Sequence, residues 1–234
     1  MQLFYHPEIN ETSEHFTFPK EESKHITKVL RKTEGDTLNI TNGKGWLFKA
    51  EITIADQKNC QITIINKELQ PKRAYSLHLA VAPTKMNDRY EWFLEKVTEI
   101  GIDSITPIIC NHSERKVIKP ERFEKILQSA MKQSLNCYLP KLNETISFKE
   151  FLNKEHSGQL YIAHCEETER RSLKQELKPK VDTTFLIGPE GDFSVKEIEM
   201  ALQQNFIPVT LGNTRLRTET AAIVACHTAA LINE

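Results

Sequence analysis

The sequence predicts an α/β protein in which a small β-barrel precedes a larger domain built on a mostly parallel sheet. Three observations lead to this fold class. Short strands with polar turns fill residues 1–70, strands alternate with helices from Ser76 onward, and two strand–loop–helix units end the chain. Short strands with polar turns are typical of barrels, and strand–helix alternation is typical of parallel sheets. We therefore place the domains at residues 1–70 and 74–234, joined by the polar linker 70–73.

The first domain is expected to hold one helix among short strands. Residues 21–32 read as a helix because Ile26, Val29 and Leu30 recur on one face. Four cations lie mostly off that face: Lys24, Lys28, Arg31 and Lys32. They are either a nucleic-acid contact or an ordinary solvated surface, and composition alone favours the solvated surface. The expected strands are 3–6, 37–41, 46–55 and 60–65, with a hairpin turn at 42–45.

The second domain is expected to alternate strands with helices. In the helix expected at 88–101, Trp92, Val97 and Ile100 are placed to join the core, and Gly101 ends the helix. The polar stretch 166–180 mixes carboxylates with cations and is interpreted as solvated surface. The other expected elements are strands at 77–82, 104–109 and 159–164 and a helix at 120–135.

The segment FLIGPEGDFS, residues 185–194, ends an apolar strand with a glycine-bounded loop. A run that is apolar on both faces is typical of a strand buried in a parallel sheet. The loop is tight because Pro189 fixes its own φ and Gly191 is free to adopt a positive φ. Ser194 and Glu197 then form the S-x-x-E capping box of a helix. Such a unit predicts either a ligand site at the carboxyl edge of the sheet or a plain connecting turn.

A second strand–loop–helix unit occupies residues 209–232. Residues 209–211 read as a strand and 212–217 as a loop that carries Arg215 and Arg217. Thr218 is the candidate N-cap of the last helix, and Glu219 complements the helix dipole in its first turn. An arginine in this loop is able to pair with a carboxylate ligand, contact a phosphate or cap a neighbouring helix. The helix is rich in alanine, which indicates close packing in a core or a subunit interface.

Composition limits the functional classes open to the chain. The 31 basic and 32 acidic side chains give a net charge of −1, so a nucleic-acid partner would have to be bound by local patches. The five cysteines are dispersed and form no C-x-x-C motif, which indicates reduced thiols and no metal site. No apolar run approaches the ~20 residues that a membrane span requires, and no targeting segment is apparent. We therefore expect a cytoplasmic protein without membrane contact.

Five segments together resemble a known family. LIGPEG at 186–191, followed by LGNTRLRTETA at 211–221, resembles the cofactor-loop pair of the SPOUT class of RNA methyltransferases. Residues 85–108, KMNDRYEWFLEKVTEIGIDSITPI, resemble the start of the catalytic domain in the ribosomal RNA uridine-N3 methyltransferases of the RsmE family. Residues 25–36, HITKVLRKTEGD, resemble the PUA-like barrel of that family. Two further segments follow in the same order: SERKV at 113–117 and AMKQSLNCYLPKL at 130–142. A match over nearly the whole chain is far more specific than either glycine loop alone.

The resemblance implies a SPOUT-type domain with a C-terminal trefoil knot, a PUA-like barrel and a homodimer. It also implies methyl transfer from S-adenosylmethionine to N3 of one uridine in the decoding region of 16S rRNA, in the small ribosomal subunit. Three residues depart from the family pattern. Asp192 stands where glycine is commoner, and Lys132 and Asn136 stand where Glu and Arg are expected. Asp192 is expected to change only the helix cap, whereas Lys132 and Asn136 weaken any RNA contact assigned to their helix.

The resemblance also implies the residues of the site. Arg217 is expected to stabilise negative charge on uracil O2 and O4 once N3 has lost its proton. Glu190 and Glu219 are the nearest carboxylates in sequence for that proton, although loop structure and helix capping explain them equally and solvent is a further acceptor. Three loops are expected to enclose the cofactor, through Ala163, His164, Leu186, Ile187, Gly188, Pro189, Glu190, Gly191, Leu211, Gly212, Leu216 and Arg217.

RNA contacts are expected from cations in both domains: Lys24, Lys28, Arg31, Lys85, Arg89, Arg115 and Lys116. Two other functions remain open. One is another SPOUT activity, either ribose 2′-O methylation or methylation of a tRNA base, which the product nucleoside would distinguish. The other is a non-catalytic RNA-binding assembly factor, which would not bind S-adenosylmethionine. The sequence lacks the G-x-G-x-x-G after a strand and the G-x-x-x-x-G-K that dehydrogenases and P-loop enzymes require.

Overall fold

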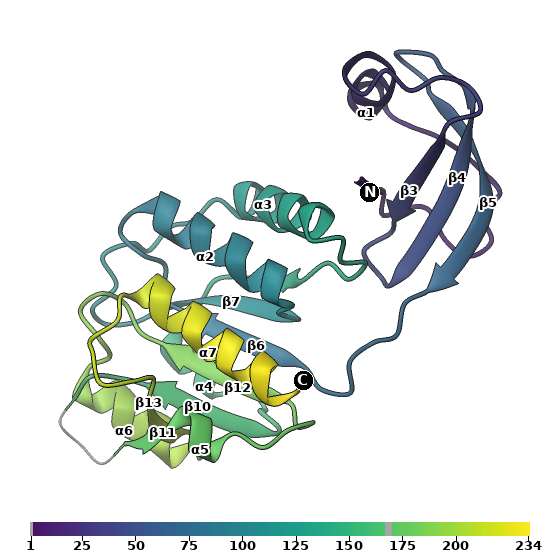
Figure 1. The fold of residues 1–234 in the computed structure, drawn as a ribbon. Helices are drawn as coiled ribbons and strands as arrows, with labels where there is room; N and C mark the ends of the chain where they lie inside the picture. Colours follow the sequence, from purple (N-terminus) through teal and green to yellow (C-terminus); the bar gives the residue numbers. More distant parts are fainter. Residues whose placement is uncertain (1, 167–169) are drawn as a thin grey trace. The chain divides into compact units, whose positions relative to one another are not determined.

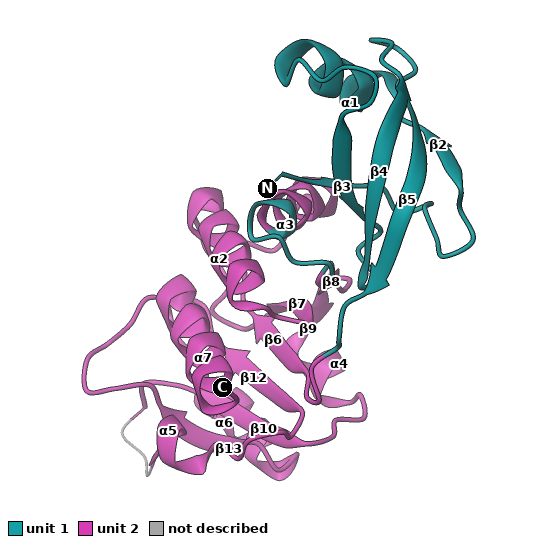
Figure 2. Ribbon diagram, turned by 45° about the vertical axis from the view of Figure 1, so that its right-hand side comes forward, with its two compact units in different colours: residues 1–72, 131–139 teal, residues 73–130, 140–234 magenta. Residues whose placement is uncertain are grey.

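The computed structural model describes residues 2–166 and 170–234, so residues 167–169 of the polar stretch 166–180 lie outside the described part (Figure 1). The chain forms two compact units (Figure 2). The first comprises residues 1–72 and 131–139, and the second comprises residues 73–130 and 140–234. Helix α3 (Pro120–Gln133) therefore begins in the second unit and ends in the first. Each unit has its own sheet.

The first unit is built on a five-stranded sheet in the order β1-β3-β4-β5-β2. Its strands are β1 (Leu3–Tyr5), β2 (His15–Thr17), β3 (Thr37–Thr41), β4 (Trp46–Ile54) and β5 (Gln61–Leu69). β1 runs parallel to β3, and the other neighbours are antiparallel. Alternate side chains bury one face of the sheet around Phe4, Phe18 and Phe48. The strands predicted at 37–41 and 46–55 are confirmed, whereas β2 was not predicted.

The helix predicted at 21–32 consists of two shorter segments, α1 (Lys20–Lys24) and the π-helix η1 (His25–Val29). The wider hydrogen-bonding pattern is seen where the Leu30 N–H donates to the His25 carbonyl at 3.0 Å. Ile26 is fully buried, but the side chain of Val29 is 65% exposed. The prediction that Ile26 and Val29 share one face is therefore wrong, because it assumed the spacing of an α-helix throughout.

Residues 131–139 complete the first unit, although they lie far from its strands in the sequence. Tyr138 pairs with Lys44 in an antiparallel bridge, and its hydroxyl donates to the Gln70 carbonyl at 2.8 Å. The Thr41 hydroxyl donates to the Cys137 carbonyl at 3.1 Å. No pattern in the sequence indicates these contacts, because each joins segments that only the fold brings together.

The second unit is built on an eight-stranded sheet in the order β11-β13-β10-β12-β6-β7-β8, with β9 paired to β7. All of its strand pairs are parallel, which confirms the predicted parallel sheet. The strands are β6 (Leu77–Val81), β7 (Ser104–Ile109), β8 (Lys141–Leu142), β9 (Ile146–Ser147), β10 (Gln159–Ala163), β11 (Arg171–Ser172), β12 (Thr183–Ile187) and β13 (Ile207–Thr210). The remaining helices are α2 (Asn87–Ile100), α4 (Phe148–Leu152), α5 (Leu173–Glu176), α6 (Val195–Gln203) and α7 (Thr218–Ile232).

Helices cover the sheet of the second unit. Helices α4 and α6 bury apolar side chains such as Phe148 and Ile198 with Ile162 of β10 and Leu186 of β12. Helix α7 lies beside α2 and against β6 and β12 (Figure 1). The prediction that Trp92 of α2 joins the core is wrong, because its side chain is 46% exposed. The sheet is thus packed by helices on both faces around its central strands β10 and β12. Their carboxyl ends therefore hold the loops that follow in place.

The interpretation of residues 166–180 as solvated surface holds for the exposed side chains of Arg171, Lys174, Lys178 and Lys180, but the strand and helix within this stretch were not predicted. β11 joins the edge of the sheet beside β13, and α5 follows it directly. Leu173 is only 2% exposed, so this short helix is anchored by an apolar side chain. Two leucines four residues apart, Leu173 and Leu177, are too short a pattern among charged residues to predict a helix.

Candidate functional site

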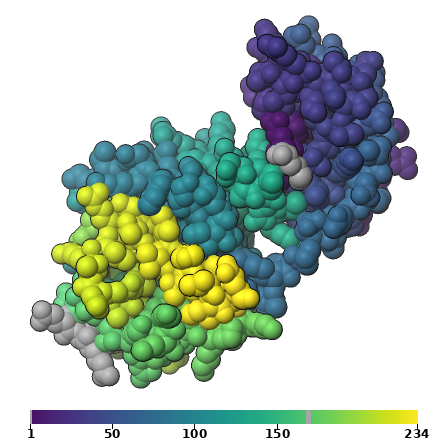
Figure 3. Space-filling model, viewed as in Figure 1, coloured from purple at the N-terminus to yellow at the C-terminus, as the bar shows by residue number. Residues whose placement is uncertain are grey.

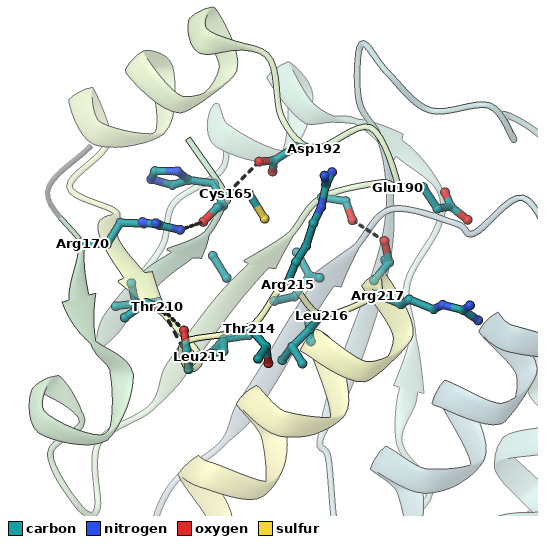
Figure 4. Close-up of a pocket in the computed structure, with 18 of the residues that line it drawn as sticks. Cys165, Arg170, Glu190, Asp192, Thr210, Leu211, Thr214, Arg215, Leu216 and Arg217 are labelled. Carbon is teal, nitrogen blue, oxygen red and sulfur yellow. Dashed lines mark hydrogen bonds between the residues drawn. The ribbon is translucent and has the colours of Figure 1, made fainter. Parts of the chain in front are cut away.

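A pocket of about 570 Å³ opens at the carboxyl ends of β10, β12 and β13 (Figure 4). Its walls come from the loops that follow these strands and from the first turn of α7. Parallel sheets commonly bind ligands at this edge, because backbone groups and helix N-termini are presented there. All the residues expected to enclose a cofactor line this pocket except Leu186 and Gly191. Leu186 instead lies fully buried in the core beneath it.

The loop after β12 differs from its predicted conformation in one residue. Gly191 does not have a positive φ; Asp192 does, with φ 64°. The Asp192 N–H donates to the Pro189 carbonyl at 2.9 Å and closes the turn. Gly191 is required for another reason, since a Cβ at this position would lie 3.0 Å from the Cβ of His112. The predicted capping box of α6 is confirmed, with Ser194 as N-cap and Glu197 returning the hydrogen bond.

Asp192 joins two of the three loops around the pocket. Its Oδ2 accepts a hydrogen bond of 2.6 Å from the Cys165 N–H, and its Oδ1 accepts one of 2.9 Å from the Phe193 N–H. The expectation that Asp192 changes only the helix cap is wrong, because Ser194 is the cap and Asp192 lies two residues before it. A left-handed conformation favours glycine, and Asp is among the few other residues that adopt it readily. The side chain therefore adds a connection that a glycine here could not make.

Substitution of Asp192 by alanine is expected to destabilise the protein by about 1–3 kcal/mol, because the left-handed backbone is retained while the hydrogen bonds are lost. Asp192→Asn tolerates the same backbone and keeps an oxygen acceptor, so it should cost less. Asp192→Gly removes the backbone strain but also the hydrogen bond to Cys165, so its stability should lie between those of the alanine and asparagine variants. Urea unfolding of the three variants measures this order, and an alanine variant as stable as the asparagine variant would contradict it.

The loop after β10 is held from the other side by Arg170. Its Nη1 donates to the His164 carbonyl at 2.7 Å. The His164 side chain is 5% exposed, and neither ring nitrogen has a hydrogen-bond partner within the described residues. Burial lowers the pKa of His164 below its usual value, so the ring is neutral at neutral pH. The part of this loop that faces the pocket is therefore shaped by backbone contacts and by an uncharged imidazole.

Several residues that line the pocket were not predicted: Cys165, Arg170, Asp192, Val209, Thr210, Thr218 and Ala221. Asn213, Thr214 and Arg215 also line it and belong to the predicted third loop. Most of the unpredicted residues lie within the predicted loops or next to them, so they extend those loops by one or two positions. No sequence pattern pointed to Arg170, because it lies among other charged residues and reaches the pocket only through the fold.

The last helix begins differently from its prediction. Arg217 is the N-cap residue, and Thr218 is the first residue of α7. The Thr218 side chain does not cap the helix; its hydroxyl donates to the Gly188 carbonyl at 3.0 Å. This bond joins the start of α7 to the loop after β12. The two strand–loop–helix units are thus fastened together at the pocket.

The two arginines of the third loop point in different directions (Figure 4). Arg215 extends across the pocket toward the side on which Asp192 lies, whereas Arg217 extends to the opposite side, on which Glu190 lies. Both residues are exposed. A cation therefore borders each side of the pocket, and the two sides differ in the carboxylates near them.

Charged residues from three loops meet on the Glu190 side. The Glu190 Oε1 accepts a hydrogen bond of 2.9 Å from the Lys85 N–H, and the Arg115 Nη2 donates to the Lys85 carbonyl at 2.8 Å. The Glu219 Oε1 lies 3.9 Å from the Arg89 Nε. Three of the cations expected to contact RNA, at positions 85, 89 and 115, are therefore brought beside the two carboxylates expected in catalysis. Lys116 follows directly and is exposed.

The remaining cations expected to contact RNA lie in the first unit. Lys24 is in α1, Lys28 is in η1 and Arg31 follows η1, and all three are exposed. The two departures in the segment 131–139 have partners within the same unit. The Lys132 Nζ lies 3.7 Å from the Glu22 Oε1, and the Asn136 Oδ1 accepts a hydrogen bond of 3.0 Å from the Tyr138 N–H. These partners give both departures a structural role.

Within residues 2–166 and 170–234, no group of His, Cys, Asp and Glu side chains is placed to hold a metal ion. All five cysteines are free, and Cys165, beside the pocket, is the one that is exposed. No helix in the same residues is both long enough and apolar enough to cross a membrane.

Comparison with protein families finds a matching family model for each of the two parts of the chain. A model of the RNA methyltransferase domain matches residues 71–230, and a model of the RNA methyltransferase PUA domain matches residues 18–65. The predicted combination of a PUA-like N-terminal domain with a mostly parallel, SPOUT-type sheet is thereby confirmed. The threading that would make a trefoil knot stays a prediction.

Individual relatives agree with these matches. The chain is 32% identical to the ribosomal RNA small subunit methyltransferase E of Buchnera aphidicola subsp. Acyrthosiphon pisum, over 90% of this chain and 85% of the relative. A probable rRNA-methyltransferase from Porphyromonas gingivalis superposes with a TM-score of 0.92 at 41% identity, covering 100% of this chain and 98% of the other. A ribosomal RNA small subunit methyltransferase E from Neisseria gonorrhoeae, solved with S-adenosyl methionine bound, superposes with a TM-score of 0.86 at 25% identity, covering 100% and 98%. The chain therefore belongs to the ribosomal RNA small subunit methyltransferase E family, the RsmE family of RNA methyltransferases.

Proposed function

We propose that the protein transfers a methyl group from S-adenosylmethionine to N3 of a specific uridine in the decoding region of 16S rRNA, acting on the small ribosomal subunit. The observation that carries this proposal is the pocket at the carboxyl ends of β10, β12 and β13, in a chain of the RsmE family. Its loops are those that the sequence assigns to the cofactor. A related methyltransferase holds S-adenosyl methionine in its crystal structure.

The residues of the pocket fit an adenosyl cofactor. Its volume of about 570 Å³ is of the size that small-molecule ligands occupy. Gly188 lines the pocket and lets the buried ring of Phe193 pack closely behind it, since a Cβ there would lie 3.1 Å from that ring. Ile187 and Leu216 supply apolar surface, and the loops present backbone N–H and C=O groups. These features suit recognition of a flat, polar-edged base by backbone contacts.

The chemistry requires few protein groups. The cofactor supplies an electrophilic methyl group on a positively charged sulfur, so the protein mainly has to orient the base and stabilise charge. Uracil N3 lies on the Watson–Crick edge, so the uridine must be unpaired or flipped out before it reacts. Loss of the N3 proton places negative charge on O2 and O4. Arg217 is the residue that we assign to this charge, because guanidinium stays protonated and donates two parallel hydrogen bonds.

We assign RNA binding to the cations near Glu190 and to those of α1 and η1. Four cations lie beside the pocket or next to residues that do: Lys85, Arg89, Arg115 and Lys116. A phosphate next to the target nucleotide would pass near them. In the first unit, the π-helix leaves Val29 in solvent close in sequence to Lys28 and Arg31. An exposed apolar side chain among cations suits a nucleic-acid surface better than an ordinary solvated one.

We further propose that the protein is a cytoplasmic homodimer. Helix α7 carries a largely apolar sequence, yet its side chains lie partly at the surface of the second unit, where Figure 3 shows them in yellow. Leu231 on this helix is 54% exposed, and Trp92 on the adjacent helix α2 is 46% exposed. A second copy of the chain would cover such a face. Sedimentation equilibrium measures the assembly, and a monomer at micromolar concentration would contradict the dimer.

Methyl transfer to small ribosomal subunits that lack the modification tests the proposed function. Incubation with labelled S-adenosylmethionine should place one methyl group on one uridine, identified as 3-methyluridine by mass spectrometry of the digested rRNA. A methylated ribose or a different base would indicate another activity of the SPOUT class. Absence of S-adenosylmethionine binding in calorimetry would indicate a non-catalytic RNA-binding protein.

A further inference from the structure

We propose that the Asp192 side of the pocket recognises the amino-acid end of S-adenosylmethionine, where Arg215 pairs with the α-carboxylate and Asp192 with the α-ammonium group. The inference rests on the proposed function, because it requires this cofactor in the pocket. It adds the two side chains that select one part of the cofactor. Both residues line the pocket, whereas the sequence leaves the partner of Arg215 open among a carboxylate, a phosphate and a helix end.

Arg215 lines the pocket and keeps its donors free. Its side chain is exposed and extends across the pocket toward the side on which Asp192 lies. No hydrogen bond joins it to Asp192 or to the other described residues drawn in Figure 4. Arg170, which also lines the pocket, is already engaged, because its Nη1 donates to the His164 carbonyl at 2.7 Å. A guanidinium carries five N–H donors and no acceptor, so Arg215 is suited to an anionic ligand.

Asp192 holds a negative charge at the wall of the pocket with part of its accepting capacity unused. Its Oδ2 accepts the Cys165 N–H at 2.6 Å, and its Oδ1 accepts the Phe193 N–H at 2.9 Å. These two bonds fix the orientation of the carboxylate. An ionised carboxylate has about four lone-pair sites, so about two remain for a ligand. The side chain is partly exposed, which leaves it open to such a ligand.

Two opposite charges that border one pocket without pairing match a zwitterion. The methionine part of the cofactor carries a carboxylate and an ammonium group on the same carbon. Between Arg215 and Asp192, the carboxylate would face the guanidinium and the ammonium group would face the Asp192 carboxylate, so that each charge meets its opposite. The adenosyl group has no charge and the sulfur is cationic. The α-carboxylate is therefore the one anion that the cofactor offers to Arg215.

An RNA phosphate is the other anion that Arg215 could bind, but the charges of the pocket place the RNA elsewhere. The cations that we assign to RNA beside the pocket gather near Glu190, and Arg217 extends to the same side. Arg215 extends to the opposite side. Sulfur bonds to the methyl group and to the amino-acid chain in different directions. A methyl group aimed at a base on the Glu190 side thus leaves the chain free to turn toward Asp192.

Calorimetry of Arg215→Ala with three adenosyl compounds tests the first contact. S-Adenosylmethionine should bind about 10-fold more weakly than to the wild type, because one charge-assisted interaction is lost. Decarboxylated S-adenosylmethionine lacks the carboxylate and should bind the variant at least as well as the wild type. 5′-Methylthioadenosine lacks the whole amino-acid end and should bind both equally. A damaged pocket would weaken all three compounds, which separates misfolding from loss of the contact.

The variant Asp192→Asn tests the second contact. Asparagine tolerates the left-handed backbone and keeps an oxygen for the Cys165 N–H, but it loses the negative charge. Affinity for S-adenosylmethionine should fall by about 5- to 10-fold. S-Adenosylhomocysteine has the ammonium group but an uncharged sulfur, and should lose as much, which excludes attraction of the sulfonium as the cause. Affinity for 5′-methylthioadenosine should not change.

Matched variants separate the remaining outcomes. Arg215→Lys should recover part of the affinity for S-adenosylmethionine, and Arg171→Ala, away from the pocket, should bind all compounds as the wild type does. Unchanged affinity in Arg215→Ala, or an equal loss for all three compounds, would overturn the proposal. Weaker binding of small ribosomal subunits with unchanged cofactor affinity would assign Arg215 to an RNA phosphate instead. Because calorimetry requires no methyl transfer, a wild type with these preferences that modifies another nucleoside would overturn only the proposed function.

Discussion

Replacement of Arg217 by alanine is expected to lower the rate of methyl transfer by about 100-fold or more, because one donor aimed at developing charge commonly contributes that much. Arg217 is the N-cap of α7 and is exposed, so its side chain carries no core packing that the substitution would remove. It also uses no side-chain bond to cap the helix. The variant should therefore fold normally and bind S-adenosylmethionine almost as well as the wild type. Single-turnover transfer to small subunits, together with calorimetry, measures both quantities.

Two comparisons make this result specific to the charge on uracil. Arg217→Lys keeps one positive charge but not the planar pair of donors, and should recover only part of the rate. Arg171 does not line the pocket, and its Nη1 lies 3.3 Å from the Glu176 Oε2. Arg171→Ala should therefore have no effect on turnover. Unchanged turnover in Arg217→Ala would remove this residue from the mechanism. A parallel loss of cofactor affinity would assign it to binding instead.

The parallel sheet of the second unit could be predicted because its information is local. Each buried strand is a short apolar run, such as residues 185–187, and each helix shows its own periodicity or cap. The capping box of Ser194 and Glu197 is confirmed for the same reason, since its two partners are three residues apart. The carboxyl edge of the sheet, and with it the position of the pocket, follows from strand direction alone.

The predictions of backbone conformation failed where the local sequence is compatible with two conformations. Positive φ was assigned to Gly191, the residue with the greatest freedom, but it occurs at Asp192. Gly191 is needed because His112 approaches it, and His112 is distant in the sequence. Val29 was placed on the same face as Ile26 by α-helical spacing, but in the π-helix Ile26 is buried and Val29 is exposed. For Gly191 the neighbour that matters, His112, is not part of the local pattern.

The composition of the pocket could be predicted only in part, for a related reason. Arg170 is held at the pocket by the hydrogen bond that it donates to the His164 carbonyl. Cys165 is held there by the hydrogen bond that its N–H donates to Asp192. Neither contact has a sequence signature, because each joins residues whose approach depends on the fold. The same holds for Arg89, which meets Glu219 across α2 and α7. Motifs identify the loops, whereas the residues that position them come from elsewhere in the chain.

A phenylalanine at position 221 is expected to exclude S-adenosylmethionine. Ala221 lines the pocket one turn into α7, where its N–H donates to the Arg217 carbonyl at 2.8 Å. The larger side chain would project into the space assigned to the cofactor. Steric conflict of this kind costs about 1–3 kcal/mol, equivalent to roughly 10- to 100-fold in affinity. Methyl transfer at limiting cofactor should fall by the same factor, and added S-adenosylmethionine should no longer raise the melting temperature as it does in the wild type.

Cys165 reports directly on the occupancy of that space, because it lines the pocket and is the exposed cysteine among the five. In the wild type, S-adenosylmethionine or S-adenosylhomocysteine should slow alkylation of Cys165, whereas in Ala221→Phe the cofactor should give no protection. Ala221→Ser adds a single oxygen and should keep both protection and activity. If Ala221→Phe unfolds, the helix rather than the pocket has failed, which urea unfolding without cofactor would reveal. Full protection of Cys165 in a folded Ala221→Phe variant would place the cofactor outside this pocket.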